Sequence, residues 1–201
     1  MVHTSFISYQ KETVIAALDF IAEQKQHIRQ LKLQARRQLS VDERRQFSAA
    51  VIDNIKRSSV WHQAQHIGIY LAINAEVDLD TLSQHNKSLY IPATQDHRMQ
   101  FHRYDAQTQL QTGPFQITQP EFKPEYVEPH LDLCLLPLVA FNRKGHRLGM
   151  GGGFYDRYFA NNRQTVLAGV AFAVQEQPQL PLEDWDVKLQ HIFTEQEHIS
   201  S

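Results

Sequence analysis

The sequence is poor in cysteine and in long apolar runs. Cys134 is the one cysteine among 201 residues, so no disulfide can form within the chain, and its apolar neighbours predict a small buried side chain. No stretch approaches the roughly 20 apolar residues that a membrane helix needs, and the first residues lack the apolar core of a signal peptide. We therefore expect a monomeric, soluble, cytoplasmic protein without a membrane partner.

A strong excess of one charge sign is also missing. The formal net charge is −2, which argues against a general nucleic-acid binder. Basic residues nevertheless crowd one early region, between Lys25 and Arg45. A basic patch of this kind suits an anionic small molecule, so we expect a small-molecule partner and no nucleic acid.

Several common site motifs do not occur. No lysine follows the glycine-rich stretch as a Walker loop requires, and Phe154 stands where a dinucleotide fingerprint needs its third glycine. The sequence has no Gly-x-Ser-x-Gly elbow and no His-Glu-x-x-His zinc motif. These absences disfavour P-loop nucleotide binding, Rossmann-type dinucleotide binding, serine hydrolysis and zinc-dependent hydrolysis.

The composition and the hydrophobic pattern predict one domain. A hydrophobic content of 42% is enough to bury one good core. Residues 1–11 show no pattern and are expected to form a flexible extension before a single domain over 12–201. Apolar residues recur at helical spacing from 12 to 38, and a capping box formed by Ser40 and Glu43 predicts a second helix that ends near Arg57.

Strands and helices alternate after these two helices. Candidate strands are 66–72, 88–93, 99–104, 131–141, 166–172 and 191–195; a short helix begins near Asp80, another covers 154–162, and 113–130 is a long ordered loop. Such alternation is typical of parallel β-α-β units. We expect an α/β fold: a single-domain, three-layer arrangement in which helices flank a mixed, mostly parallel sheet, preceded by the two N-terminal helices.

A glycine-rich stretch stands out within this order. Five of the eight glycines lie between Gly145 and Gly153, after an apolar strand and before a helix. Glycines let an anion approach backbone N–H groups, and this position is where open α/β sheets bind ligands. Asp156 could hold Mg²⁺ and Arg147 could offer a planar fork to a phosphate. A mobile loop, with Asp156 serving the helix dipole, is an equally good interpretation of these residues alone.

Residues 138–159, LVAFNRKGHRLGMGGGFYDRYF, resemble the signature of 5-formyltetrahydrofolate cyclo-ligases, also called 5,10-methenyltetrahydrofolate synthetases. In that family an apolar strand leads into Gly-x-Arg-Leu-Gly-x-Gly-x-Gly-x-Tyr-Asp. The matching residues are Gly145, Arg147, Leu148, Gly149, Gly151, Gly153, Tyr155 and Asp156. The similarity extends from about residue 25 to 195.

The resemblance implies an enzyme that uses ATP and Mg²⁺ to convert 5-formyltetrahydrofolate into 5,10-methenyltetrahydrofolate, with release of ADP and phosphate. In the family the formyl oxygen attacks the γ-phosphate to give an iminium phosphate, and N10 closes the ring as phosphate leaves. Such phosphoryl transfer depends mostly on positioning and charge neutralisation.

The resemblance also assigns residues to this reaction. Arg147 and Tyr155 would be catalytic, with Arg147 steadying the transferred charge. The predicted ATP-binding residues are Lys25, Arg29, Arg147, Gly149, Met150, Gly151, Gly152, Gly153, Phe154 and Tyr155. Without the resemblance, Lys25 and Arg29 would be interpreted as an ordinary solvated helix face.

Four residues are implied at the folate: Leu71, Glu76, Phe115 and Tyr155. Glu76 would accept hydrogen bonds from the polar edge of the pterin, although an exposed loop acid is the simpler alternative. A loop-anchoring or core side chain is about as good an interpretation of Phe115.

Asp156 and Asp186 are the implied metal ligands. Asp186 lies in a stretch similar to the family's closing motif, where Trp185 replaces the usual histidine. Gln190 stands near the position of a further family aspartate, which puts a third ligand there in doubt. A surface turn acid is the alternative for Asp186.

Two other functions stay open on the sequence alone. One is a different ATP-dependent ligase or kinase that shares the glycine loop but not the folate pocket. The other is a catalytically silent member of the fold that binds folate, a protein or RNA through its basic helix.

Overall fold

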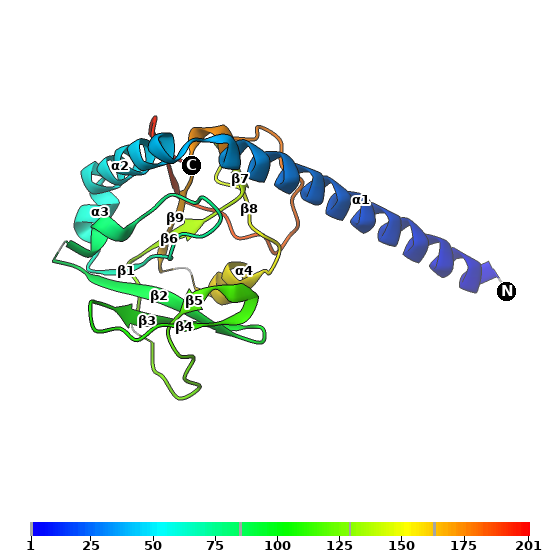
Figure 1. The fold of residues 1–201 in the computed structure, drawn as a ribbon. Helices are drawn as coiled ribbons and strands as arrows, with labels where there is room; N and C mark the ends of the chain where they lie inside the picture. The colour runs from blue at the N-terminus through cyan, green and yellow to red at the C-terminus, as the bar shows by residue number, and fades with distance from the viewer. Residues whose placement is uncertain (1, 85, 129, 163) are drawn as a thin grey trace.

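The computed structural model describes residues 2–84, 86–128, 130–162 and 164–201; the side chains of residues 2–18, 84 and 115 lie outside the description. Its centre is a seven-stranded sheet with the order β11-β10-β9-β6-β1-β2-β3 (Figure 1). The strands are β1 His66–Gly68, β2 Ser88–Gln95, β3 Arg98–Tyr104, β6 Leu133–Pro137, β9 Val166–Val170, β10 His191–Phe193 and β11 His198–Ser200.

The sheet is mixed and mostly parallel, as the sequence predicted. Strand β6 pairs in parallel with β1 and β9, which in turn pair in parallel with β2 and β10. The two edge strands, β3 and β11, are antiparallel to their neighbours. The short helices and hairpins around the sheet include η1 Asp80–Gln84, η2 Pro114–Gln116, η3 Ala173–Gln175, the β4–β5 pair (Gln111–Thr112, Thr118–Gln119) and the β7–β8 pair (Ala140–Phe141, Arg147–Leu148).

Helices α2 (Val41–Arg57), α3 (Ser59–Gln63) and α4 (Phe154–Phe159) complete the three layers. Successive side chains of a strand point to opposite faces. In β6, Leu133 and Leu135 belong to the apolar cluster that contains buried residues of α2, whereas Cys134 and Leu136 belong to a second cluster with Phe159 of α4. The predicted burial of Cys134 is confirmed, and burial raises the pKa of its thiol.

Helix α1 (Val2–Gln38) is longer than the sequence predicted. Residues 2–11, expected to form an extension without regular structure, continue the helix. Figure 1 shows its carboxyl-terminal part lying on the domain and its amino-terminal part projecting away from it. No helix among the described residues is long and apolar enough to cross a membrane.

The predicted capping box at the start of α2 is confirmed. Ser40 Oγ accepts a hydrogen bond from the Glu43 amide at 3.2 Å, and Glu43 Oε2 accepts one from the Ser40 amide at 2.8 Å. Replacing Ser40 with alanine is expected to lower the free energy of unfolding by about 1 kcal/mol, because one amide of the first turn loses its partner. Urea denaturation followed by circular dichroism checks this value, and a Ser83→Ala variant provides an exposed serine control.

Some predicted boundaries were wrong. Strand 66–72 ends at Gly68, and helix 154–162 ends at Phe159, before two turn-forming asparagines. Strand 131–141 is interrupted after Pro137, which has no amide to continue the ladder. The chain then forms the β7–β8 hairpin, so the glycine-rich stretch follows a hairpin and not the end of a sheet strand.

Candidate active site

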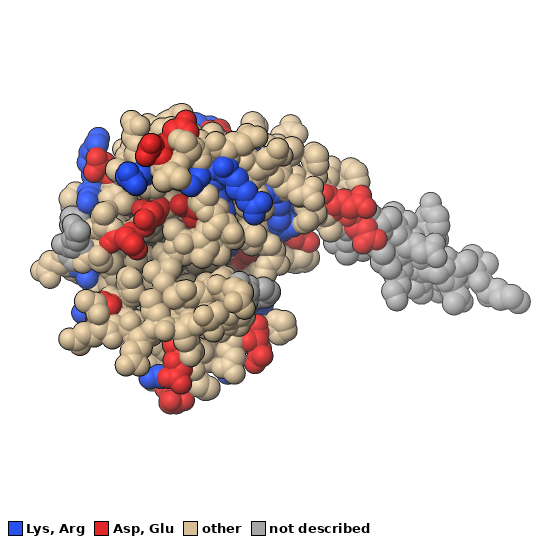
Figure 2. All heavy atoms as spheres, viewed as in Figure 1, with Lys and Arg blue, Asp and Glu red and all other residues tan. Residues whose placement is uncertain are grey.

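The buried face of α1 carries four cations in place of an apolar stripe. Lys25, Arg29, Lys32 and Arg36 follow one another at spacings of four, three and four residues, which places them on one side of the helix. Each contacts a different part of the domain. In Figure 2, Lys and Arg spheres gather where the carboxyl-terminal part of α1 lies on the domain.

Lys25 binds two carboxylates of the 181–188 segment. Its ammonium lies 2.5 Å from Glu183 Oε2 and 2.9 Å from Asp186 Oδ2, and the residue is 7% exposed. The amide of Glu183 donates to the same Asp186 oxygen at 2.9 Å. The alternative of a solvated face is therefore wrong for Lys25, and a surface turn is too simple a description of Asp186.

Arg29 holds the glycine-rich segment. Its Nε donates to the Gly149 carbonyl oxygen at 2.9 Å. Gly151 adopts φ +99 and Gly153 adopts φ +64, a left-handed conformation that residues with a Cβ rarely adopt. A Cβ at Gly149 would meet nothing within 4 Å, so this part of the segment borders open space. The bare backbone here could cradle an anion.

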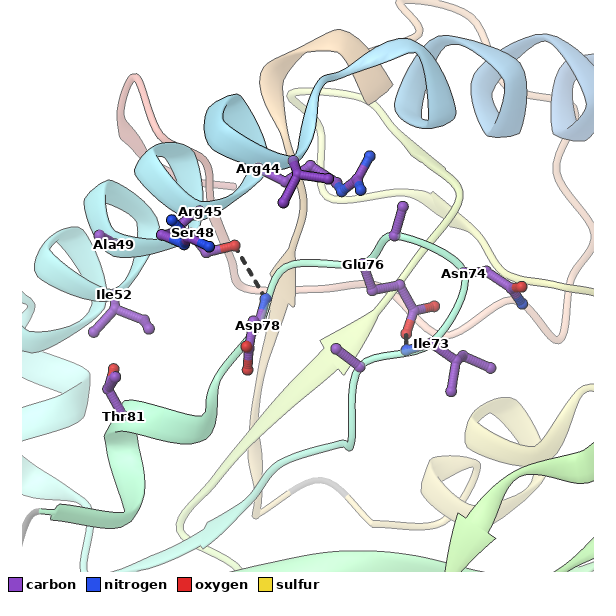
Figure 3. A pocket seen from close by; sticks show the side chains of 13 residues that line it. Arg44, Arg45, Ser48, Ala49, Ile52, Ile73, Asn74, Glu76, Asp78 and Thr81 are labelled. Atoms are coloured by element: carbon purple, nitrogen blue, oxygen red, sulfur yellow. Dashed lines mark hydrogen bonds between the residues drawn. The ribbon is translucent and has the colours of Figure 1, made fainter.

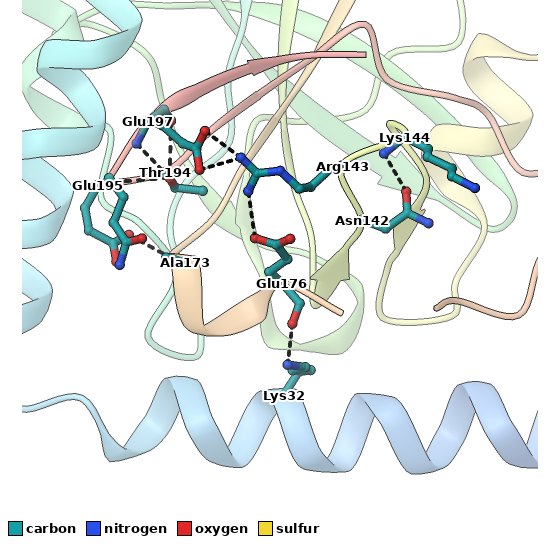
Figure 4. Close-up of polar contacts among 10 residues, drawn as sticks. Lys32, Asn142, Arg143, Lys144, Ala173, Glu176, Thr194, Glu195 and Glu197 are labelled. Carbon is teal, nitrogen blue, oxygen red and sulfur yellow. Dashed lines mark hydrogen bonds and ion pairs between the residues drawn. The ribbon is translucent and has the colours of Figure 1, made fainter. Parts of the chain in front are cut away.

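Lys32 holds α1 against η3, the short helix that follows β9. Its ammonium donates to the carbonyl oxygens of Val174 and Glu176 at 3.2 and 2.5 Å. The Glu176 carboxylate in turn accepts from Arg143 Nη1, and Arg143 Nη2 donates to both carboxylate oxygens of Glu197 at 2.7 Å (Figure 4). The two Lys32 hydrogen bonds hold α1 on the domain and thereby help to place Lys25 and Arg29.

Arg147 joins the glycine-rich segment to the 181–188 segment. Its Nη2 donates to Asp156 Oδ1 at 2.8 Å, and its Nη1 donates to the Val187 carbonyl oxygen. The Val187 amide donates to the same Asp156 oxygen at 3.1 Å. Asp156 is thus held on α4 beside the residue that follows Asp186.

The two predicted metal carboxylates fit a magnesium ion that is shared with phosphates. Asp156 and Asp186 each use one oxygen for the contacts above, and the other oxygen makes no hydrogen bond with a described residue. Magnesium is commonly held by one or two carboxylates together with phosphates and waters. No group of three or more histidine, cysteine and acidic side chains suited to a metal occurs in the described part of the chain.

Gln190 lies outside the cluster that Lys25, Arg29 and Arg147 form with Asp156 and Asp186. Its side-chain oxygen accepts from the Leu167 backbone amide at 2.8 Å, and its own backbone amide donates to the Leu167 carbonyl oxygen at 3.0 Å. Gln190 therefore attaches this part of the chain to β9. Trp185, between the acids of the 181–188 segment, is 63% exposed. A third protein carboxylate at position 190 is therefore absent, in agreement with the substitution seen in the sequence.

Tyr155 connects this cluster electrostatically with Glu76. The pKa of its hydroxyl is raised well above the ordinary value, chiefly because of desolvation; Cys134 and Glu76 add to the shift and Arg147 opposes it. Tyr155 is therefore a neutral hydrogen-bonding group at neutral pH. Two of the predicted site residues, Tyr155 and Glu76, are thus close enough for the charge of one to affect the other.

Glu76 lies in a strained turn and is well buried. Its side chain is 8% exposed, and its Oε2 accepts from the Ile73 amide at 3.1 Å. The intervening residues, Asn74 and Ala75, have φ values of 49 and 62, and strain of this kind is concentrated at functional sites. The turn borders a cavity of about 460 Å³ that faces α2 (Figure 3). The alternative of an exposed loop acid is wrong.

The pKa of Glu76 is raised above its ordinary value because burial disfavours the charge. The Ile73 amide and the guanidinium of Arg36 oppose that shift. The sequence patterns did not single out Arg36, Lys32 or Glu183, although the 4-3-4 spacing of cations on α1 could have revealed the first two.

The other predicted residues lie around this region. The Gly152 carbonyl accepts from Arg157 at 2.7 Å, and the Arg157 guanidinium lies 5.2 Å from the ring centre of Phe154. Met150 is 54% exposed, and Leu71 is partly buried against the cluster on the α2 side. The side chain of Phe115 lies outside the described residues.

Comparisons with known proteins identify relatives of this chain. Residues 21–195 match the model of the 5-formyltetrahydrofolate cyclo-ligase family. The chain is 38% identical over 138 residues to 5-formyltetrahydrofolate cyclo-ligase of Haemophilus influenzae, covering 63% of this chain and 74% of that protein. It is 33% identical over 142 residues to the Escherichia coli protein of the same name, covering 65% and 78%.

Solved structures show the same fold. The 5,10-methenyltetrahydrofolate synthetase of Aquifex aeolicus superposes with a TM-score of 0.76 at 30% identity, covering 88% of this chain and 92% of that one. The Mycoplasma pneumoniae enzyme superposes with a TM-score of 0.66 at 26% identity, covering 85% and 98%.

Proposed function

Because the chain belongs to the 5-formyltetrahydrofolate cyclo-ligase family and is an enzyme of that kind, we propose that it converts 5-formyltetrahydrofolate into 5,10-methenyltetrahydrofolate with ATP and Mg²⁺. ADP and phosphate are the other products. The main support is the cluster in which Lys25, Arg29 and Arg147 hold the glycine-rich segment and two carboxylates together. Its mixture of cations, bare backbone and carboxylates suits a magnesium–triphosphate group.

Each part of the cluster has a role in nucleotide binding under this proposal. The segment from Gly149 to Gly153 binds the phosphates with its backbone amides, helped by Arg29. Asp156 and Asp186 would hold Mg²⁺ through the carboxylate oxygens that make no hydrogen bond with a described residue. Lys25 orients Asp186 and lowers the negative charge that the phosphates meet.

The bound nucleotide supplies the phosphoryl group that activates the formyl oxygen as an iminium phosphate. Arg147, fixed by Asp156 and Val187, steadies the charge of the transferred group. Tyr155, whose neutral hydroxyl can donate a hydrogen bond, would orient the formyl group of the folate. N10 of the folate then attacks the activated carbon, and the C–O bond breaks as phosphate leaves.

Glu76 is proposed to accept N–H groups of the pterin ring. Replacing it with glutamine keeps its size but removes the charge, so affinity for 5-formyltetrahydrofolate is expected to fall roughly 10- to 100-fold. Isothermal titration calorimetry measures this change, and Asp80→Asn, an exposed acid that does not line the cavity, is the control. Unchanged affinity in the Glu76→Gln protein would remove Glu76 from the folate site.

The affinity of the unmodified protein should depend on pH. The charged form of Glu76 is the form that accepts N–H groups, so affinity is lost as the pH falls through its pKa. Burial raises that pKa, so the loss should begin at a higher pH than for an ordinary glutamate, whose pKa is about 4.3.

The reaction itself has a direct test. Purified protein is incubated with 5-formyltetrahydrofolate and Mg²⁺, with and without ATP, and absorbance is followed in the methenyl-folate band. Growth of the band only with ATP supports both the reaction and the nucleotide. A folded protein that produces no band under either condition contradicts the proposal.

A further inference from the structure

Arg36 is a buried cation with unused hydrogen-bonding capacity. It is 1% exposed, and its Nη1 donates to the Leu138 carbonyl oxygen at 3.2 Å. The same nitrogen lies 3.9 Å from Glu76 Oε1. Its Nε and Nη2 have no hydrogen-bond partner among the described residues. A guanidinium this deeply buried is costly unless a counter-charge and acceptors face it.

Glu76 provides that counter-charge and has acceptor capacity to spare. A carboxylate offers about four acceptor sites. From the described residues Glu76 receives one hydrogen bond, from the Ile73 amide, in addition to the loose ion pair with Arg36. Each group of this buried pair thus has capacity left for further contacts.

Other groups around Glu76 do not replace Arg36. The Tyr70 hydroxyl is used in a hydrogen bond to the Val77 carbonyl oxygen at 2.9 Å. Tyr155 on α4 is neutral, because desolvation raises its pKa. The remaining charged residues lining the cavity are Arg44, Arg45 and Asp78. Arg45 forms an exposed pair with Asp42, and Arg44 donates to the Leu39 carbonyl oxygen. No ion pair joins either arginine to Glu76 among the described residues.

We propose that Arg36 is a positioning residue for substrate recognition: from the buried face of α1 it keeps the Glu76 carboxylate ionised and aimed at the N–H edge of the pterin ring. This proposal rests on the proposed function of Glu76. The contact joins the helix that carries Lys25 and Arg29 to the folate side of the site. One helix would therefore align both substrates.

The test is a double-mutant cycle on substrate affinity. The dissociation constant of 5-formyltetrahydrofolate is measured by calorimetry for the full chain and for Arg36→Met, Glu76→Gln and the double variant. Arg36→Met is expected to weaken binding roughly tenfold in the native background and to have little further effect beside Glu76→Gln. Arg37→Met removes the same charge from the exposed neighbour and is expected to leave affinity unchanged.

The pH dependence gives a second measurement that packing alone would not change. Without Arg36, Glu76 keeps the effect of burial and loses its cation, so its pKa should rise further. The affinity of Arg36→Met should then fall off at a higher pH than that of the native chain and recover as the pH is raised. Arg36→Lys keeps the charge, so the pH at which half of the affinity is lost should stay near its native value.

The outcomes separate the two proposals. Native protein that does not bind 5-formyltetrahydrofolate contradicts the proposed function. In a second case the native protein binds, but Arg36→Met weakens the affinity equally in the native and the Glu76→Gln backgrounds, or leaves the pH midpoint of binding unchanged. Either result overturns the role of Arg36 and leaves the proposed function standing. If Arg36→Met does not fold, Arg36→Gln takes its place in the cycle, because it also removes the charge while it keeps a hydrogen-bond donor; a loss independent of Glu76 again overturns the proposal.

Discussion

Replacing Asp156 with asparagine is expected to lower kcat about 100-fold or more while the chain stays folded. Asparagine has nearly the same shape, and its side-chain oxygen can still accept from Arg147 and the Val187 amide. The negative charge on the second oxygen is lost, however, and with it the proposed anchor for Mg²⁺. Arg147 also loses its counter-charge.

Initial rates of methenyl-folate formation at saturating ATP and several Mg²⁺ concentrations measure this effect. We expect the residual rate to require more Mg²⁺ than the native rate does. Asp184→Asn makes the same chemical change at an exposed acid two residues before Asp186 and should leave kcat unaltered. Near-native turnover by a folded Asp156→Asn protein would reject the metal assignment.

The Arg147→Lys change should also reduce kcat strongly, by about 10- to 100-fold. Lysine keeps the positive charge but replaces the planar fork with a single ammonium. Arg147 binds Asp156 and the Val187 carbonyl at once, and its side chain is 5% exposed. One ammonium cannot hold both segments in the same geometry and also face a transferred phosphoryl group.

Arg143→Lys is the matched control for Arg147→Lys. Arg143 also forms two ion pairs, with Glu176 and Glu197. Its side chain is 52% exposed, however, and lies outside the cluster. Because exposed ion pairs contribute little, this control should leave kcat unchanged and alter stability by less than about 1 kcal/mol. If Arg147→Lys turns over at the native rate, Arg147 has only a structural role.

Features that depend on neighbouring residues could be predicted well from the sequence. The capping box of Ser40 and Glu43 is local, because the two residues complete it between themselves. The candidate strands 88–93 and 99–104 correspond to β2 and β3, and 131–141 contains β6, because hydrophobic periodicity is also a local pattern. The resemblance to the cyclo-ligases rested on another short-range pattern, the glycines with Arg147, Tyr155 and Asp156.

Features that depend on partners far along the chain were missed. The β7–β8 hairpin and the edge strand β11 were missed for a different reason, because strands of two or three residues are too short to show hydrophobic periodicity. On α1, Lys25 and Arg36 are ordinary helix cations in the sequence. Their burial becomes visible only when Glu183 and Asp186, about 160 residues later, and Glu76 are brought against that face.

The sequence by itself determined the fold class and the family of this protein, because periodicity, turn chemistry and the glycine signature are local patterns. It also supplied the carboxylates, cations and glycines that the proposed chemistry needs. Only the tertiary structure decided which of these groups meet. It placed Arg147 between Asp156 and Val187, tied Gln190 to β9, and buried Arg36 beside Glu76. Such choices depend on desolvation and charge pairing between distant segments, which leave no periodic signal in the chain.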